Sequence, residues 1–210
     1  RDRMVLSKGH ACPALYSVLA MRGFFPETEI PTFRHLGSRL QGHPVMYKIP
    51  GVDMSTGSLG QGISAACGMA IKAKRCKEDY KVFAIIGDGE SQEGQVWEAA
   101  MFAAHYKLDN LIVFLDYNHL QIDGDVRSVM NPTPLDEKFA AFSWYVQVID
   151  GHSIKEIDYA VNNAYKSDKP SVIICNTVKG KGVSFMENNH TWHGKAPKKD
   201  DYEKAAAELK

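Results

Sequence analysis

Hydrophobic and polar positions along the chain alternate between two kinds of segment. Continuous apolar runs, typical of strands buried on both faces, occupy residues 81–86, 111–116, 144–150 and 171–178. Segments with apolar or alanine residues at helical spacing occupy residues 11–23, 62–75, 95–106, 154–166 and 200–210. Strands separated by helical crossovers favour parallel pairing, with helices covering the sheet. We therefore predict an α/β fold, a three-layer parallel sheet with helices on both faces.

Two of the predicted strands end abruptly at small, oxygen-bearing side chains. The first is followed by Gly-Asp-Gly at 87–89, and the second ends in Asp-Tyr-Asn at 116–118. Ligands of such sheets bind outside the carboxyl ends of the strands. Carboxylate and amide oxygens suit Mg²⁺, which also keeps phosphate oxygens in its coordination shell. The glycines would let an anion approach the backbone closely, so the pattern indicates a metal-bridged phosphate site.

Simpler readings of the same residues stay open at this point. Asp88 could belong to a tight turn only, and Asn118 could only cap a loop. A dinucleotide site is a further alternative, but the segment GDGESQEG lacks the GxGxxG spacing that such a site needs.

Composition narrows the class of protein. The 210 residues suffice for one sizeable domain, and 25 basic against 25 acidic residues give no sign of a nucleic-acid or acidic-lipid partner. The apolar runs are too short to span a bilayer. The four cysteines form no CxxC pair, which favours reduced residues in a cytoplasmic protein. Two long loops, 34–51 and 178–200, are candidates for functional segments.

The spacing of the two strand ends resembles the thiamine-diphosphate motif, a GDG triplet followed about thirty residues later by Asn. Further segments stand in the order found in transketolases: RDRMVLSKGHACPALYSVLAMRG (1–23), GHP (42–44), STGSLGQGISAACGMA (55–70), GDGESQEGQVWEAA (87–100), YNHLQIDG (117–124), IDGH (149–152) and HTWHG (190–194). The resemblance covers essentially the whole chain. It implies the thiamine-diphosphate-binding fold, with residues 1–210 as a single diphosphate-binding domain.

This resemblance implies a cofactor site with a metal. Asp88, Asn118 and the main-chain carbonyl of Leu120 match the positions that bind Mg²⁺ or Ca²⁺ in transketolases. Gly89 matches a glycine whose backbone touches the diphosphate. The positions that match contacts to thiamine diphosphate are His10, Gly57, Ser58, Leu59, Asp88, Gly89, Asn118, Leu120 and His193.

The resemblance also implies catalytic roles. His10, His43 and His193 match imidazoles that line the channel above the thiazolium ring, where they would move protons on the substrate hydroxyls. Glu93 matches a glutamate at the interface with the partner's pyrimidine-binding domain. Val45 stands where the family usually has Glu. A structural role is expected of the remaining histidines considered, His35, His105, His119 and His152, and the roles of Lys179 and Lys181 are left open.

The implied activity is transfer of a two-carbon ketol unit from a ketose to an aldose, such as sugar phosphates, with the thiazolium ring as electron sink. Thiamine-diphosphate enzymes also need a pyrimidine-binding domain, for which this chain has no residue set. We expect the partner to be a carboxy-terminal transketolase subunit, in a heterotetramer that includes self-association of this chain. A fragment of a longer protein is the other explanation.

Two other functions remain as alternatives. A related thiamine-dependent synthase, such as deoxyxylulose-phosphate synthase, is disfavoured by the GHP and HTWHG segments. A non-catalytic cofactor-binding module is disfavoured by the full set of matching metal and channel positions.

Overall fold

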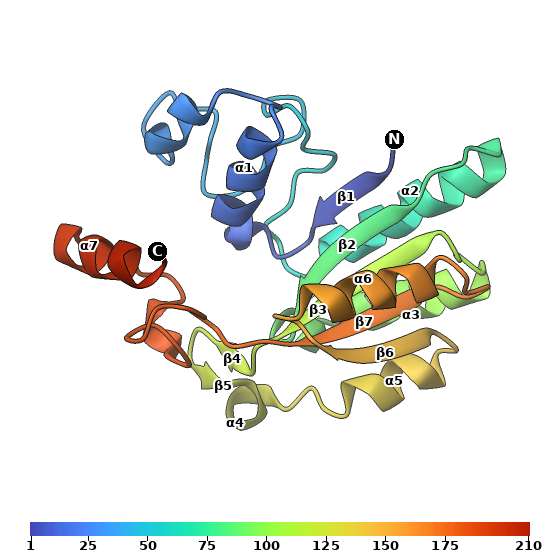
Figure 1. The fold of residues 1–210 in the computed structure, drawn as a ribbon. Helices are drawn as coiled ribbons and strands as arrows, with labels where there is room; N and C mark the ends of the chain where they lie inside the picture. The colour runs from blue at the N-terminus through green and yellow to red at the C-terminus, as the bar shows by residue number, and fades with distance from the viewer.

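The computed structural model describes residues 1–210 and is built around a sheet of five parallel strands (Figure 1). The strands are β1 (Arg3–Leu6), β2 (Val82–Gly87), β3 (Leu111–Tyr117), β6 (Tyr145–Asp150) and β7 (Ser171–Asn176), in the spatial order β1-β2-β3-β7-β6. Every neighbouring pair is parallel. The predicted parallel α/β sheet is confirmed.

Helices cover both faces of this sheet. On one face lie α2 (Gln61–Cys76), α3 (Gly94–His105) and α5 (Leu135–Ala141); α6 (Ile154–Ala164) lies on the other. Successive strand residues point to opposite faces, so Val113 joins the large core cluster under α2 and α3, whereas Ile112 joins a smaller cluster with Ala160 and Ala164. The three-layer prediction is confirmed.

Smaller elements surround the carboxyl edge of the sheet. They are α1 (Cys12–Met21), the hairpin of β4 (Leu120–Gln121) and β5 (Gly124–Asp125), α4 (Val126–Met130) and α7 (Lys199–Glu208). Single 3-10 turns occupy Gly9–Ala11, Glu27–Thr32, Glu90–Gln92 and His190–Trp192. Helix α1 and the loop after it form a hydrophobic cluster of their own around Tyr16 and Leu40. None of the helices has both the length and the apolar character needed to cross a membrane.

The long, strongly patterned elements agree with the sequence prediction to within a few residues. Five elements of two to seven residues escaped the sequence prediction: β1, the hairpin strands β4 and β5, α4 and α5. They are too short to show a periodicity of their own. Strand β1 is held by its backbone pairing with β2 and by burial of Val5 and Leu6, which are tertiary effects.

The strand register sets the position of the site. Gly87, the last residue of β2, lies opposite Asp116 of β3, and Asp116 lies opposite Cys175 of β7. The carboxyl ends of three neighbouring strands therefore meet at one edge of the sheet. The chain segment after β1 passes the same edge, because the amide of Ser7 still donates to the carbonyl of Ile85 at 2.9 Å.

Close packing of α2 on the end of β1 leads to a stability prediction. A Cβ atom on Gly62 would lie 2.5 Å from Ser7 Oγ and 2.6 Å from Ser7 Cα, whereas one on Gly68 of the same helix would meet nothing within 4 Å. We expect Gly62→Ala to lower the free energy of unfolding by about 1–3 kcal/mol, because backbone must move. Gly68→Ala should raise it by about 0.5–1 kcal/mol through helix propensity.

Urea unfolding of the full-length protein measures both changes, and Gly68→Ala is the matched control on the same helix. Equal effects of the two substitutions would contradict the packing of α2 on Ser7.

Candidate active site

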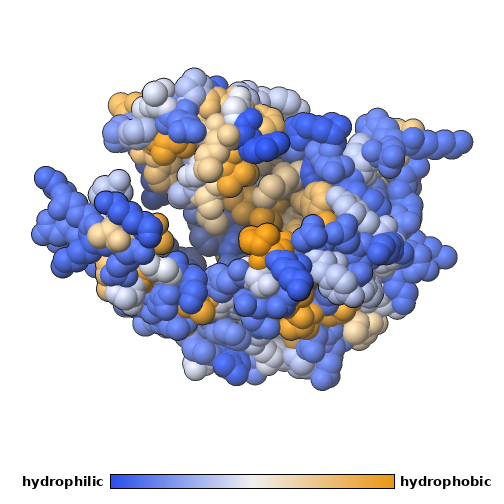
Figure 2. Space-filling model, in the orientation of Figure 1, coloured by the Kyte–Doolittle hydropathy of each residue, from blue (hydrophilic) through white to orange (hydrophobic).

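A cavity of about 700 Å³ opens at the carboxyl edge of the sheet. On the face shown in Figure 2, apolar residues gather around a central hollow and the rim is hydrophilic. Of the residues singled out in the sequence, the cavity lining includes His10, Leu59, Asp88, Gly89, Glu93, Asn118, Leu120 and His193. Gly57, Ser58 and His43 are not part of the lining. Gly57 and His43 pack together behind it, since a Cβ on Gly57 would lie 2.7 Å from His43 Cδ2.

Asp88 and Asn118 follow the ends of the adjacent strands β2 and β3. Both are buried, and Asp88 is only 2% exposed. The carboxylate of Asp88 accepts the amide of Gly89 at 2.7 Å through Oδ1 and the amide of His119 at 2.6 Å through Oδ2. Asn118 Oδ1 accepts the amide of Leu120 at 3.1 Å. The main chain of the turn 118–120 is thus hydrogen-bonded to both side chains.

Two acidic side chains at this edge differ in their surroundings. Burial would raise the pKa of Asp116, but Lys8 and the hydrogen bonds from Lys8, Thr177 and Asn118 hold it below its usual value. For Asp88, burial raises the pKa to about 6, although backbone amides counter part of the shift. Asp88 has no cation within ion-pair distance, whereas Asp116 is paired with Lys8. A cation is therefore what the environment of Asp88 lacks.

The donor set decides how such a cation could be held. No group of three or more His, Cys, Asp or Glu side chains is arranged to hold a metal ion. One carboxylate, one amide oxygen and a main-chain carbonyl are hard oxygen ligands that suit Mg²⁺ or Ca²⁺. They cannot fill a shell of about six oxygens, so the remainder would come from an anionic ligand and water. The residues fit a metal that is bound together with a phosphate group.

The glycine-rich segment before α2 is held against this edge by Glu90. The buried carboxylate of Glu90 accepts the amide of Gly60 at 2.8 Å, the amide of Gly87 at 3.1 Å and the hydroxyl of Ser7. Gly57 and Gly60 have φ values of +146° and +81°, which residues with a Cβ rarely adopt. Glu90 thereby ties the end of β1, the GDG turn and the glycine loop into one unit that places Leu59 at the cavity.

Two imidazoles meet across the cavity. The ring centroids of His10 and His193 lie 5.0 Å apart. Partial burial, with the positive fields of His193 and Lys8, lowers the pKa of His10 to about 4. Burial, followed by Lys179, also lowers the pKa of His193. Both rings are therefore neutral at pH 7, and each can donate and accept a hydrogen bond.

His193 also has an unmet requirement. Its Nδ1 is buried and has no hydrogen-bond partner. Lys179 lies in the same lining, makes no ion pair within 4 Å, and has a pKa lowered by burial and by Lys8. An anionic group in the cavity would supply the opposite charge that Lys179 lacks. This agrees with the phosphate-bearing ligand that the metal ligands require.

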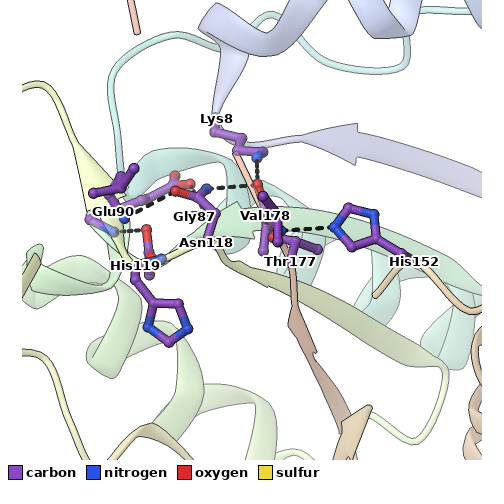
Figure 3. Close-up of polar contacts among 12 residues, drawn as sticks. Lys8, Gly87, Glu90, Asn118, His119, His152, Thr177 and Val178 are labelled. Atoms are coloured by element: carbon purple, nitrogen blue, oxygen red, sulfur yellow. Dashed lines mark hydrogen bonds and ion pairs between the residues drawn. The ribbon is translucent and has the colours of Figure 1, made fainter. Parts of the chain in front are cut away.

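Several lining residues escaped the sequence analysis. Lys8 and Thr177 (Figure 3) are joined through Asp116 into a connected polar group of the cavity lining. His152 accepts the amide of Val178 at 2.8 Å through Nε2 (Figure 3) and so anchors the loop that carries Lys179, which agrees with the structural role expected of it. Asp116 had a visible signal, because it ends an apolar run in the same way as Asp88. Lys8 had no such signal in the sequence, because only strand β1 brings it close to Asp116.

Glu93 lies at the other side of the cavity, at the start of α3. It borders the glycine loop, because a Cβ on Gly60 would lie 2.9 Å from Glu93 Cβ. Because Glu93 is solvent-exposed and part of the lining, it lies at the cavity mouth. No hydrogen bond or ion pair of this chain involves its carboxylate.

Comparisons with solved structures agree with this geometry. The crystal structure of transketolase from Campylobacter jejuni superimposes with a TM-score of 0.94 at 37% sequence identity, over 100% of this chain and 34% of that chain. Transketolase of Homo sapiens is 44% identical over 99% of this chain, which corresponds to 33% of the human protein. The chain thus spans about a third of these longer transketolases.

Shorter relatives match over more of their length. The 6-deoxy-6-sulfo-D-fructose transketolase subunit SqwG of Clostridium sp. (strain MSTE9) is 49% identical, over 100% of this chain and 76% of the relative. An apulose-4-phosphate transketolase subunit from Actinobacillus succinogenes is 44% identical with the same coverage. The family model for the transketolase thiamine diphosphate-binding domain matches residues 1–209. The chain belongs to the transketolase family, as the amino-terminal part of a transferase that uses thiamine diphosphate with a divalent metal ion.

Proposed function

We propose that this chain is the diphosphate-binding half of a transketolase that transfers a two-carbon ketol unit from a ketose to an aldose. The observation that carries the proposal is the meeting of Asp88, which lacks a cation, with Asn118, His10 and His193 in one cavity. Residues 1–210 act in it as a single domain. The four free cysteines support a reducing, cytoplasmic compartment.

Within this proposal, the protein oxygens that hold Mg²⁺ or Ca²⁺ come from Asp88, Asn118 and the carbonyl of Leu120. Gly89, Leu59, His10 and His193 of the cavity lining would contact the cofactor, with Gly57 and Ser58 in the loop that would lie along it. Support comes from the buried, pre-arranged oxygens of the first set and from the place of both histidines in the lining.

When bound, thiamine diphosphate supplies the electron sink that two-carbon transfer requires. The chain's own contribution is to fix the diphosphate end and to move protons. His10 and His193 are neutral at pH 7, so each can take a proton from a substrate hydroxyl and return it once protonated, or donate a hydrogen bond to a developing alkoxide. His43, which packs against Gly57, is the third proton-transfer imidazole of this proposal.

A second chain completes the site in this proposal. The cavity contains groups that bind a metal and a diphosphate. Glu93, at the cavity mouth, would contact the pyrimidine-binding partner, a carboxy-terminal transketolase subunit. Self-association through α3 is supported by its exposed apolar side chains, Met101 and Phe102, and by Tyr106 just after it. Two copies of each chain give a heterotetramer. The names of two relatives give 6-deoxy-6-sulfo-D-fructose and apulose 4-phosphate as their sugars. The sugar of this chain is a ketose, with or without phosphate.

The histidine roles lead to a prediction about turnover. His193→Ala and His43→Ala should each lower kcat by about 10²–10⁴-fold, because a proton-transfer group is lost. Binding of Mg²⁺ and thiamine diphosphate should remain largely intact. Steady-state kinetics of the complete enzyme and calorimetric cofactor titration measure the two properties. His35→Ala, on an exposed loop, is the control. Wild-type turnover in both site variants would contradict the proton-transfer role of these histidines.

Assembly gives a second prediction. The purified chain with Mg²⁺ and thiamine diphosphate should show negligible transketolase activity, and mixing with the pyrimidine-binding chain should restore it. Light scattering should then report two copies of each chain. Phe102→Glu on α3 should reduce the assembly to one copy of each chain, whereas Ile154→Glu, at an exposed apolar residue of α6, should not. Full activity of the lone chain would refute the shared site.

A further inference from the structure

The carboxylate of Asp116 accepts hydrogen bonds from three side chains that come from different parts of the chain. Lys8 Nζ, from the segment after β1, and Asn118 Nδ2 both donate to Oδ2, the latter at 3.0 Å. Thr177 Oγ1, from the segment after β7, donates to Oδ1. Asp116 belongs to the cavity lining, together with Lys8, Asn118 and Thr177. The proposed metal, cofactor and proton-transfer groups do not include it.

One of these contacts decides how Asn118 faces the cavity. The amide of Asn118 is held at both ends, because Nδ2 donates to Asp116 and Oδ1 accepts the amide of Leu120 at 3.1 Å. A rotation by about 180° would place Oδ1 against the carboxylate of Asp116 and Nδ2 against the amide hydrogen of Leu120. Both contacts would then be repulsive. The pair of partners therefore permits a single orientation of the Asn118 amide.

The orientation matters because only one end of an amide can bind a cation. Mg²⁺ and Ca²⁺ accept oxygen ligands, and an amide nitrogen presents hydrogens to them. Partners of this kind commonly orient metal ligands in proteins, and their loss typically weakens metal binding by about 10–100-fold. Asn118 is 9% exposed and contributes one of the few oxygens available at the end of β3.

We propose that Asp116 is a positioning residue of the metal site, which orients the amide of Asn118 so that its oxygen serves as the metal ligand. The inference rests on the proposed function, since it assumes that Asn118 binds the metal. It goes beyond that function because Asp116 is not among the proposed metal or cofactor ligands and acts through a neighbouring side chain.

A different role for Asp116 makes different predictions. If the carboxylate only neutralised Lys8, removal of its charge would be harmful in every variant, and removal of Lys8 would repair the damage. If it orients Asn118, what matters is an acceptor at position 116. Asp116→Asn keeps an amide oxygen for Asn118 but loses the charge, whereas Asp116→Leu removes both. The two substitutions therefore separate the roles.

The experiment is a calorimetric titration of the complete enzyme, this chain with its partner, with Mg²⁺ at saturating thiamine diphosphate. Asp116→Leu should raise the Kd for Mg²⁺ by about 10–100-fold, and Asp116→Asn should stay near the wild type. The double variant Lys8→Met/Asp116→Leu should bind Mg²⁺ more weakly than Lys8→Met alone by the same factor. Thr177→Val, which removes a contact of Asp116 but none of Asn118, is the control.

Urea unfolding without metal and cofactor checks that each variant is folded. If Asp116→Leu alone does not fold with Lys8 left unpaired, the double variant, which has no unpaired lysine, provides the comparison. The proposal is overturned if Asp116→Leu binds Mg²⁺ like the wild type, if Asp116→Asn is as weak as Asp116→Leu, or if Lys8→Met restores binding. A wild-type enzyme that binds neither Mg²⁺ nor thiamine diphosphate would instead overturn the proposed function.

Discussion

A buried carboxylate without a cation is the constraint on which the arrangement of this domain depends. Asp88 is 2% exposed, and its two oxygens accept only backbone amides. An ionised group in such a place is costly unless a positive charge compensates it. Asp116, on the next strand, has that compensation from Lys8. The contrast between the two neighbours leaves room for one divalent cation, and the cavity around it supplies the hydrogen-bond groups for an anion.

The rest of the fold fixes the relative positions of Asp88 and Asn118. Parallel pairing of β2 with β3 brings Gly87 opposite Asp116, so Asp88 and Asn118 emerge side by side from a rigid sheet. Glu90 then binds the glycine loop to the same edge, and His152 anchors the loop that carries Lys179. Both loops of the site are thus tied to the sheet edge by hydrogen bonds, which keeps the cavity formed before a ligand arrives.

Sequence reasoning reached the parts of this site that depend on strand ends. The apolar runs before Asp88 and Asn118 predicted both strands, and the helical crossover between them then placed the two residues on neighbouring or nearby strands at the same edge of the sheet. Lys8 could not be found in this way, because its contact with Asp116 joins positions 108 residues apart and requires β1, a strand of four residues. The structural role expected of His152 agrees with its contact, but its partner, the amide of Val178, could not be identified because only tertiary packing brings the two together.

Protein and diphosphate together complete the metal site in this account, since the chain offers too few oxygens by itself. Calorimetric titration of the complete enzyme with Mg²⁺, with and without thiamine diphosphate, tests this most directly. We predict strong Mg²⁺ binding only when thiamine diphosphate is present, a reciprocal gain in thiamine diphosphate affinity with Mg²⁺, and loss of both in Asp88→Ala. Equally tight Mg²⁺ binding without thiamine diphosphate, or unchanged coupling in Asp88→Ala, would contradict the account.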